Sequence, residues 1–346
     1  MRVGFDGTPL LGRSQGIRRY VVELGRALRR IDGLELVPIG RGVDSRVGSI
    51  PRLGFVVRHA DQLVASPLRL RRRADVFHYT DTYGPLVRSR PLVVTVHDTT
   101  FLTHPELHDP RMVRWLTTLT ERSWRRADAL IAVSEVTSAD LRRAGVPAER
   151  IRVIHLGVDH VAQEQVSDRL VPPGRYFCYV GNIEPRKGVD TLLTAFGAAA
   201  GSLPQDVDLI LVGKHAWGAH PVAVPKEVRD RIHFLGWVDD PEVFGLMARS
   251  LAVVYPSRYE GFGLPPLEAL ATGASVIVGD TPVAREVLGD HAEYIPVGDH
   301  AALRDALLRT VEAGIGDKSA RVAHARSFSW WETALATEAL YRDLVG

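Results

Sequence analysis

The sequence contains one cysteine, three methionines and no long run of apolar residues. The single thiol, Cys178, excludes an internal disulfide framework and any metal site that needs several cysteines. No apolar run approaches the ~20 residues of a membrane-spanning helix. The N-terminal residues, Met1–Asp6, are typical of a first strand and not of a signal peptide. These absences predict a cytoplasmic protein without structural disulfides.

The net charge is only +2, but the charges are unevenly distributed. Residues 1–165 contain 26 arginines, no lysine and 18 acidic side chains, a balance of +8, which leaves −6 for the remainder. Residues 52–73 alternate apolar residues with Arg58, Arg69, Arg71, Arg72 and Arg73, a pattern that predicts a basic amphipathic helix. A basic first half suits an anionic acceptor or peripheral contact with the inner face of a membrane, although a solvated arginine-rich surface is the alternative. The basic residues show no nucleic-acid-binding motif, so we expect no nucleic-acid partner.

The length of 346 residues and the order of elements predict two domains. Short apolar strands alternate with helices throughout, which is typical of doubly wound α/β domains with parallel sheets. Residues 160–175 lose this periodicity and contain Pro172-Pro173-Gly174, so they are the expected linker. We therefore predict one domain over 1–165, a second over 172–328, and a final helix over 329–346.

Three residues of the first half lie where doubly wound sheets bind ligands, beyond the carboxyl ends of strands. Gly16 belongs to a glycine-bearing loop between the first strand and the first helix. That loop lacks the G-x-G-x-x-G spacing, which argues against a nicotinamide dehydrogenase. His97 and Asp98 follow an apolar strand directly, so His97 is predicted to serve a site and not merely to be a satisfied polar residue.

Two adjacent cations mark the start of the second half. A strand ends at Gly181, and the chain continues as N-I-E-P-R-K-G with Arg186 and Lys187 just before a predicted helix. Such a pair beside a helix start can clamp a diphosphate. Ordinary surface charges are the alternative, and the flanking glycines weigh against it. Another strand of this half ends at Gly213, which we also expect at the substrate-binding edge.

The segment with the most chemical information is E-G-F-G-L-P-P-L-E, residues 260–268. It follows a short apolar strand and predicts a glycine loop that leads into a helix N-terminus, with Glu260 before the helix and Glu268 in its first turn. Amides at a helix N-terminus suit phosphate, and carboxylates accept hydrogen bonds from sugar hydroxyls. A nucleotide-sugar meets both demands, whereas a simple turn with a capping glutamate is the alternative for this segment alone.

Taken together and in this order, these motifs resemble the GT-B glycosyltransferases of family GT4 over nearly the whole chain. The resemblance implies two Rossmann-like domains that face each other across a cleft, with the last helix crossing back to the first domain. The second domain would bind a nucleotide-sugar, and the first would mostly bind the acceptor. It also implies a retaining reaction that needs no metal and no cofactor.

The resemblance assigns a role to each matching residue. Arg186 and Lys187 match the phosphate-binding pair, Glu260 matches the glutamate that contacts the donor sugar, and Glu268 matches the one that contacts the ribose. The family's active-site histidine near the sugar corresponds to His97. The remaining matches are expected to bind substrate: Gly16, Asp98, Gly181, Gly213, Val238, Gly261, Phe262, Gly263 and Leu264. Among these, the amides of Gly263 and Leu264 would hold phosphate or sugar oxygens, and Val238 would lie near the base.

The pattern looks most like bacterial mannosyltransferases of polysaccharide and glycolipid assembly. GDP-mannose is therefore the favoured donor and a glycan or glycolipid the expected acceptor; UDP-glucose, another UDP-hexose or a dTDP-deoxysugar remains open. Two other functions remain open as well: a sugar-nucleotide epimerase of the same architecture, and a non-catalytic nucleotide-sugar-binding protein.

Overall fold

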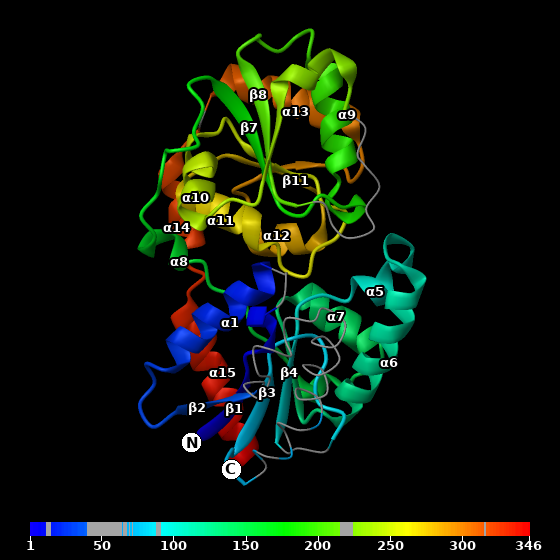
Figure 1. Cartoon of the computed structure of the whole chain (residues 1–346), viewed down its shortest axis with the longest axis vertical. Coiled ribbons are helices and arrows are strands. Elements are labelled where there is room, and N and C mark those ends of the chain that lie inside the picture. The colour runs from blue at the N-terminus through cyan, green and yellow to red at the C-terminus, as the bar shows by residue number, and fades with distance from the viewer. Residues whose placement is uncertain are drawn as a thin grey trace, which may run out of the picture. The chain divides into compact units, whose positions relative to one another are not determined.

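The chain folds into two compact units, shown in Figure 1. The structure, a computed structural model, describes residues 1–11, 15–39, 72–87, 91–214, 224–314 and 316–346, together with Val64, Leu68 and Leu70. Unit 1 comprises Met1–Gly157 and Ser329–Gly346, and unit 2 comprises Val158–Phe328. Most of the basic helix predicted over 52–73 lies outside the described residues. None of the described helices is long and apolar enough to cross a membrane.

Unit 1 contains a six-stranded, fully parallel sheet in the order β2-β1-β3-β4-β5-β6. Its strands are β1 (Arg2–Asp6), β2 (Glu35–Ile39), β3 (Val76–Tyr79), β4 (Leu92–Val96), β5 (Ala129–Ala132) and β6 (Ile151–Val153). Its helices are α1 (Gln15–Leu28), α5 (Thr100–Thr103), α6 (Pro110–Arg126), α7 (Glu135–Arg143) and α15 (Trp330–Val345), with short 3-10 turns at Thr8–Leu11, Pro105–Leu107 and Ala148–Arg150. Every residue of β3, β4 and β5 is buried, as expected for a parallel sheet covered on both faces.

The last helix, α15, packs against α1 and β3 of unit 1, so its predicted return to the first domain is confirmed. It begins where the hydroxyl of Ser329 accepts a hydrogen bond from the Trp331 amide at 3.1 Å, an N-cap that satisfies one of the first donors of the helix. Trp330 is buried beside Tyr20 of α1, with 6.1 Å between ring centroids. The Arg30 guanidinium lies over the Trp331 ring at 4.9 Å.

The two compact units divide at Gly157/Val158, just before the segment 160–175 that the sequence predicts as a linker. The backbone amide of Val158 donates to Phe328 O at 2.9 Å within unit 2. Farther on, Ser167 N donates to Pro241 O at 3.0 Å. These backbone hydrogen bonds hold the segment to the rest of unit 2.

Unit 2 repeats the architecture with the order β12-β11-β10-β7-β8-β9, again all parallel. Its strands are β7 (Arg175–Val180), β8 (Val207–Val212), β9 (Ile232–Gly236), β10 (Val253–Tyr255), β11 (Val276–Gly279) and β12 (Glu293–Ile295). Its helices are α8 (His160–Gln163), α9 (Val189–Ala199), α10 (Asp240–Arg249), α11 (Leu264–Thr272), α12 (Pro282–Leu288), α13 (His300–Ala313) and α14 (Lys318–Ala325), with 3-10 turns η5 (Pro185–Lys187) and η6 (Lys226–Arg231). This is the strand order of a doubly wound nucleotide-binding sheet.

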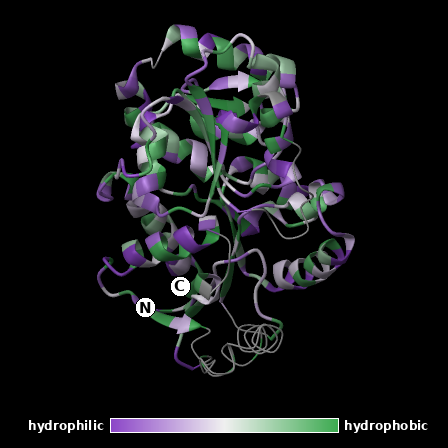
Figure 2. Cartoon of the chain, turned by 45° about the horizontal axis from the view of Figure 1, so that its top comes forward, coloured by the Kyte–Doolittle hydropathy of each residue, from purple (hydrophilic) through white to green (hydrophobic). Residues whose placement is uncertain are grey.

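Helices cover both faces of the second sheet. In Figure 1, α9 and α13 lie side by side, and α10, α11 and α14 form a separate group. Figure 2 shows the strands between them coloured mainly as hydrophobic. Strand β7 illustrates the reason, because its residues Tyr176–Tyr179 are all fully buried. The predicted pair of doubly wound α/β domains is therefore confirmed.

A chain of buried polar groups ties α15 to the sheet of unit 1. The two ring nitrogens of His78, on β3, lie 2.6 Å from the Tyr341 hydroxyl and 2.7 Å from the Thr95 hydroxyl. The Thr95 hydroxyl also lies 2.8 Å from the Tyr20 hydroxyl. Burial, together with the nearby His97, lowers the pKa of His78 to about 3, so the imidazole is neutral in the folded protein at neutral pH.

We predict that His78 makes unit 1 sensitive to acid. Its folded pKa lies below the ordinary value of 6.5, so its contribution is fully present above pH 6.5 and is lost as the pH falls toward 3. Between these values the unfolded chain binds the extra proton, and the free energy of unfolding should fall by up to about 1.4 kcal/mol per pH unit. Urea unfolding of the wild type and of His78→Gln at pH 7 and pH 5.5 measures this contribution. Equal losses in the two proteins would contradict it.

Candidate active site

The predicted donor-binding residues meet at the point where the strand order of the second sheet reverses. Strands β7 and β10 are neighbours in this sheet although about 70 residues separate them in the chain. The loop after β7 carries Arg186 and Lys187, and the loop after β10 carries Glu260. Ligands of open α/β sheets bind beyond the carboxyl ends of the strands at this reversal. Topology therefore explains why these two motifs come together.

A short ion pair joins the two loops. The Lys187 ammonium lies 2.6 Å from Oε1 and 2.8 Å from Oε2 of Glu260, and it donates a third hydrogen bond to the Tyr255 hydroxyl at 2.8 Å. The side chains of Lys187 and Glu260 are only 11% and 12% exposed. All three protons of the ammonium are therefore directed at oxygen atoms in a largely dry environment.

Arg186 completes the charged cluster. Its guanidinium lies 3.3 Å from Glu260 Oε2 and 2.8 Å from Glu184 Oε1, and it donates to the Tyr259 carbonyl at 3.2 Å. The Arg186 side chain is 15% exposed. Two cations and two carboxylates thus share one partly buried site, in which each charge is held by an opposite one.

The environment keeps Glu260 ionised. Burial alone would raise the pKa of its carboxyl, but the charges of Lys187 and Arg186 overcome this effect and lower the pKa below its ordinary value. Burial lowers the pKa of the Lys187 ammonium, and the negative charge of Glu260 opposes that shift. Each member of the pair therefore depends on the other for its charged state.

Gly188 explains why the cation pair is followed by glycine. Its backbone has φ of 66° and ψ of 24°, in the left-handed region that other residues rarely adopt. A Cβ atom at this position would lie 2.2 Å from the carbonyl oxygen of Pro256. A side chain would therefore push the Arg186-Lys187 loop away from the segment after β10.

The N-terminus of α11 offers fewer donors than the sequence suggests. Gly263, with φ of 88°, precedes the helix, and Pro265 and Pro266 have no amide proton to donate. The Leu267 amide turns back to Gly263 O at 3.4 Å. The amides of Gly263 and Leu264, the two predicted from the sequence, are thus the donors of this first turn that remain to face an anion.

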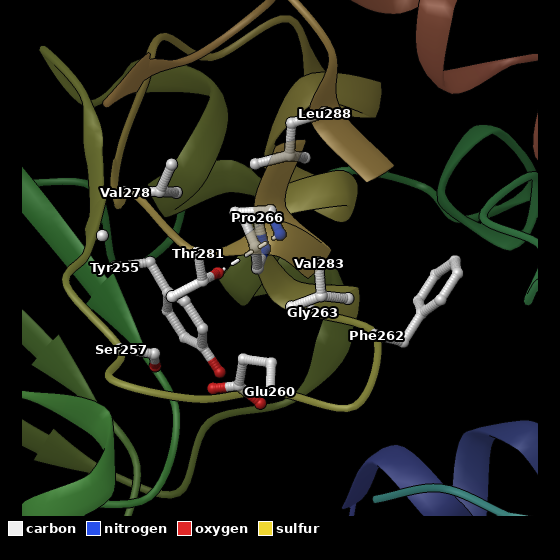
Figure 3. A pocket seen from close by; sticks show the side chains of 12 residues that line it. Tyr255, Ser257, Glu260, Phe262, Gly263, Pro266, Val278, Thr281, Val283 and Leu288 are labelled. Atoms are coloured by element: carbon white, nitrogen blue, oxygen red, sulfur yellow. Dashed lines mark hydrogen bonds between the residues drawn. The ribbon is translucent and has the colours of Figure 1, made fainter. Parts of the chain in front are cut away.

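A pocket lies beside the loop that carries Glu260 and leads into α11 (Figure 3). Polar groups line one part of it, and apolar side chains from α11, β11 and α12 line the rest. Its lining consists of Tyr255, Ser257, Glu260, Phe262, Gly263, Pro266, Val278, Gly279, Thr281, Val283, Ala284 and Leu288. In Figure 3 the side chain of Phe262 points away from Glu260, and its ring packs against Phe328 at 6.0 Å. Phe262 therefore lines the edge of the pocket through its packing on Phe328 and does not extend toward Glu260.

Glu268, the second glutamate of the motif, is bound by a histidine that the sequence analysis did not identify. His160 Nε2 lies 3.0 Å from Glu268 Oε1, and both side chains are buried. The sequence signal for His160 is weak, because this residue stands in the segment whose lack of apolar periodicity predicts a linker. The sequence analysis also missed Tyr255, which accepts a hydrogen bond from Lys187, and Glu184, which pairs with Arg186. A tyrosine in a strand or a glutamate in a loop is too common to predict contact with a cation.

Two of the other predicted residues use their amides within the sheet. The Gly181 amide donates to Val212 O at 2.9 Å, and the Gly213 amide donates to Gly236 O at 2.7 Å. These amides hold neighbouring loops together and are therefore not available to a ligand. The two glycines can still contribute by allowing a ligand to approach the backbone closely, since they carry no side chain. Val238 is half-buried in the loop after β9, beside the exposed Trp237. Gly261 is buried in the loop between Glu260 and α11.

The predicted residues of unit 1 occupy the carboxyl edge of its own sheet. His97 follows β4, and its Nε2 donates to the Thr80 carbonyl at 2.9 Å; burial lowers the pKa of this imidazole. The Asp98 carboxylate accepts from the Thr100 hydroxyl at 2.7 Å, which gives it a local turn-forming role. Gly16 lies within the first turn of α1, and the loop residues 12–14 before it lie outside the described residues. Among the residues that the structure describes, no three His, Cys, Asp or Glu side chains form a metal-binding group.

The chain is similar to known glycosyltransferases along most of its length. Residues 14–161 match the family model of Glycosyltransferase Family 4, and residues 163–325 match that of Glycosyl transferases group 1. The chain is 28% identical to O-antigen chain mannosyltransferase B of Escherichia coli, over 99% of this chain and 100% of the relative. It is 29% identical to the GDP-mannose:cellobiosyl-diphosphopolyprenol alpha-mannosyltransferase of Xanthomonas oryzae, over 67% of this chain and 63% of that protein.

A solved structure shares the fold. The crystal structure of Anabaena HepE in complex with UDP and glucose matches with a TM-score of 0.72 and 20% identity, over 99% of this chain and 100% of that one. The two family models together cover nearly the whole sequence. The protein is therefore a GT4-like glycosyltransferase of GT-B fold.

Proposed function

We propose that the protein is a retaining, metal-independent mannosyltransferase that transfers mannose from GDP-mannose to a glycan or glycolipid acceptor. The observation that carries this proposal is the cluster of Arg186, Lys187 and Glu260 at the strand reversal of unit 2. The names of the relatives support the sugar and the acceptor class, because one is an O-antigen chain mannosyltransferase and another uses GDP-mannose on a diphosphopolyprenol glycan.

The cations would bind the donor diphosphate. Lys187 and Arg186 supply positive charge, and the amides of Gly263 and Leu264 supply neutral donors at a helix N-terminus. As the bond between sugar and diphosphate breaks, negative charge develops on the leaving group, and fixed cations in a dry site stabilise it most effectively. In this proposal the two side chains take the role that a metal ion has in other transferases.

Glu260 would orient the donor sugar. Both of its oxygens already accept hydrogen bonds from Lys187, which favours an orienting role over attack on the anomeric carbon. Without a protein nucleophile, retention requires that the acceptor hydroxyl approach from the side of the departing diphosphate. The bond between the sugar and the diphosphate would break to give an ion pair of an oxocarbenium-like sugar cation and the leaving diphosphate. The leaving phosphate would then help to remove the proton of the acceptor hydroxyl as that hydroxyl bonds to the anomeric carbon.

Unit 1 would bind the acceptor. Its arginines give the first half of the chain a positive balance, and His97 lies at the carboxyl edge of its sheet. An acceptor that carries a diphosphate, such as the diphosphopolyprenol glycan named for one relative, matches this charge.

A panel of nucleotides tests the donor. We expect GDP and GDP-mannose to raise the melting temperature most, because a ligand at 100 times its Kd adds about 2.7 kcal/mol to the free energy of unfolding. UDP, UDP-glucose and dTDP are the comparison ligands, since Anabaena HepE was crystallised with UDP-glucose. Selective stabilisation by UDP-glucose would contradict the mannosyl donor while leaving a glycosyltransferase in place. Product analysis with the selected donor then distinguishes a transferred sugar from an epimerised nucleotide.

Substitutions in the ion pair should separate diphosphate binding from transfer. Lys187→Met removes a phosphate ligand, so the Kd for GDP should rise roughly 10- to 100-fold. Glu260→Gln removes the carboxylate that competes for the cations, so GDP should bind as tightly as before or more tightly, while the rate of sugar transfer falls. Calorimetry with GDP and a transfer assay measure the two effects.

The stability of the same variants provides the control. Lys187→Met leaves the buried Glu260 carboxylate with Arg186 as its remaining cation and should lower the free energy of unfolding by about 1–3 kcal/mol. The double variant with Glu260→Gln should recover part of this loss but not the affinity for GDP. Arg175→Met is a matched surface control, because the Arg175–Asp206 pair is 43% and 57% exposed, and should change stability by less than about 1 kcal/mol. If Lys187→Met binds GDP normally, the phosphate assignment is wrong.

We also propose that α6 contacts an anionic membrane. Its exposed surface carries five arginines together with the apolar side chains of Met112 and Trp115, which are 40% and 41% exposed. The arginines are Arg111, Arg114, Arg122, Arg125 and Arg126. Basic and aromatic side chains on one exposed helix suit the interface of a bilayer with negative headgroups, where a lipid-linked acceptor would be found.

Vesicle sedimentation tests this contact. The protein should bind vesicles that contain phosphatidylglycerol and not vesicles of phosphatidylcholine alone, and added salt should weaken the binding. Trp115→Ala and the double variant Arg111→Gln/Arg114→Gln should each reduce the bound fraction. Unchanged binding by both variants would exclude α6 as the contact surface.

A further inference from the structure

Tyr255 is a buried residue of the candidate site, and its side chain lines the pocket of Figure 3. It is the last residue of β10, is only 2% exposed, and pairs with Val278 of β11. Its ring stacks on the ring of Tyr179 from β7, with 6.0 Å between the centroids and 17° between the planes. Strand pairing and ring stacking together fix the position of the Tyr255 hydroxyl.

This hydroxyl is one of the acceptors that surround the Lys187 ammonium. Lys187 Nζ donates to it at 2.8 Å and directs its two other hydrogen bonds to the oxygens of Glu260. In Figure 3 the hydroxyl points toward the Glu260 carboxylate. Burial and the negative charge of Glu260 raise the pKa of the Tyr255 phenol well above its ordinary value. The hydroxyl therefore keeps its proton, which it can donate to the carboxylate.

A diphosphate can bind Lys187 only in place of one of these acceptors, because an ammonium has three protons and all three are engaged. The two acceptor residues are held differently. Glu260 belongs to the loop between β10 and α11, and its side chain can turn about several bonds, whereas Tyr255 is fixed by the sheet. The anionic phosphate also repels the carboxylate. Glu260 is therefore the partner that makes way for a phosphate, and Tyr255 is the partner that stays.

We propose that Tyr255 is a positioning residue for the donor diphosphate: its hydroxyl holds the Lys187 ammonium at the end of the strand when the phosphate replaces Glu260. This inference rests on the proposed function, because it requires a nucleoside diphosphate at Lys187. The hydroxyl acts only through Lys187 and contacts neither the phosphate nor the sugar. The competing account is that Tyr255 only fills the core of unit 2, in which case its hydroxyl and Lys187 would affect nucleotide binding independently.

A double-variant cycle between Tyr255 and Lys187 tests the proposal. The Kd of GDP, or of UDP if the nucleotide panel selects it, is measured by calorimetry for the wild type, Tyr255→Phe, Lys187→Met and the double variant. Tyr255→Phe removes one hydroxyl and keeps the stacked ring, so the Kd should rise roughly 3- to 10-fold, as for the loss of one hydrogen bond. In the Lys187→Met background the same substitution should change the Kd by less than about twofold, because the group that the hydroxyl positions is absent.

Tyr176→Phe is the matched control. Tyr176 is 1% exposed and lies near the start of β7, away from the loop that carries the cations. Its hydroxyl donates to the Leu246 carbonyl at 2.9 Å. The control therefore also removes one buried hydrogen bond of a tyrosine, and it should leave the Kd of the nucleotide unchanged with or without Lys187.

Equal weakening of nucleotide binding by Tyr255→Phe in both backgrounds, or no weakening in either, would overturn the proposal while leaving the donor site in place. If the wild type binds neither GDP nor UDP, the proposed function fails together with this inference. The melting temperature of each variant shows whether it is folded during the titrations.

A crystal structure of the wild type with the selected nucleotide decides the question without any variant. Lys187 Nζ should remain within hydrogen-bonding distance of the Tyr255 hydroxyl and should lose at least one of its bonds to Glu260. An ammonium that leaves Tyr255 and keeps both bonds to Glu260 would contradict the positioning role.

Discussion

The buried ion pair between Lys187 and Glu260 is the interaction on which the candidate site depends. It joins the loop after β7 to the loop after β10, and it can form because the strand order of the sheet reverses between these two strands. Removing two charges from water is costly unless each is paired and hydrogen bonded. The three short bonds of the Lys187 ammonium meet this condition. The same arrangement holds two cations, Arg186 and Lys187, at the edge where a diphosphate would lie.

The two units use buried polar groups in different ways. In unit 1, His78 is neutral and joins Tyr341, Thr95 and, through Thr95, Tyr20, so that the final helix is fixed to the sheet. In unit 2, the cluster of Lys187, Glu260 and Arg186 lies at the carboxyl edge of the sheet and retains opposite charges. A neutral network contributes specificity to a fold, whereas a charged cluster of this kind is available to bind a charged ligand.

Local sequence patterns predicted most of the fold. Fully buried parallel strands stand in the sequence as continuous apolar runs, and the glycines that follow them mark where they end. The site motifs were equally visible, since Arg186-Lys187-Gly188 and the segment 260–268 each carry several unusual residues close together. The division at Gly157/Val158 could not be predicted, because contacts with residues far away in the chain, such as the bond from the Val158 amide to Phe328 O, hold this segment to unit 2. His160 was missed for a related reason: its partner, Glu268, is 108 residues away. A pairing at that separation is set by tertiary packing and leaves no local pattern.

The central claim is that the donor diphosphate binds between the two cations and the start of α11. A crystal structure of the protein with GDP-mannose tests it most directly. The account predicts oxygen atoms of the β-phosphate within hydrogen-bonding distance of Lys187 Nζ and the Arg186 guanidinium, with the Leu264 amide directed at the same group and Glu260 facing the mannose hydroxyls. A diphosphate bound elsewhere, with Lys187 still fully engaged by Glu260 and Tyr255, would contradict it.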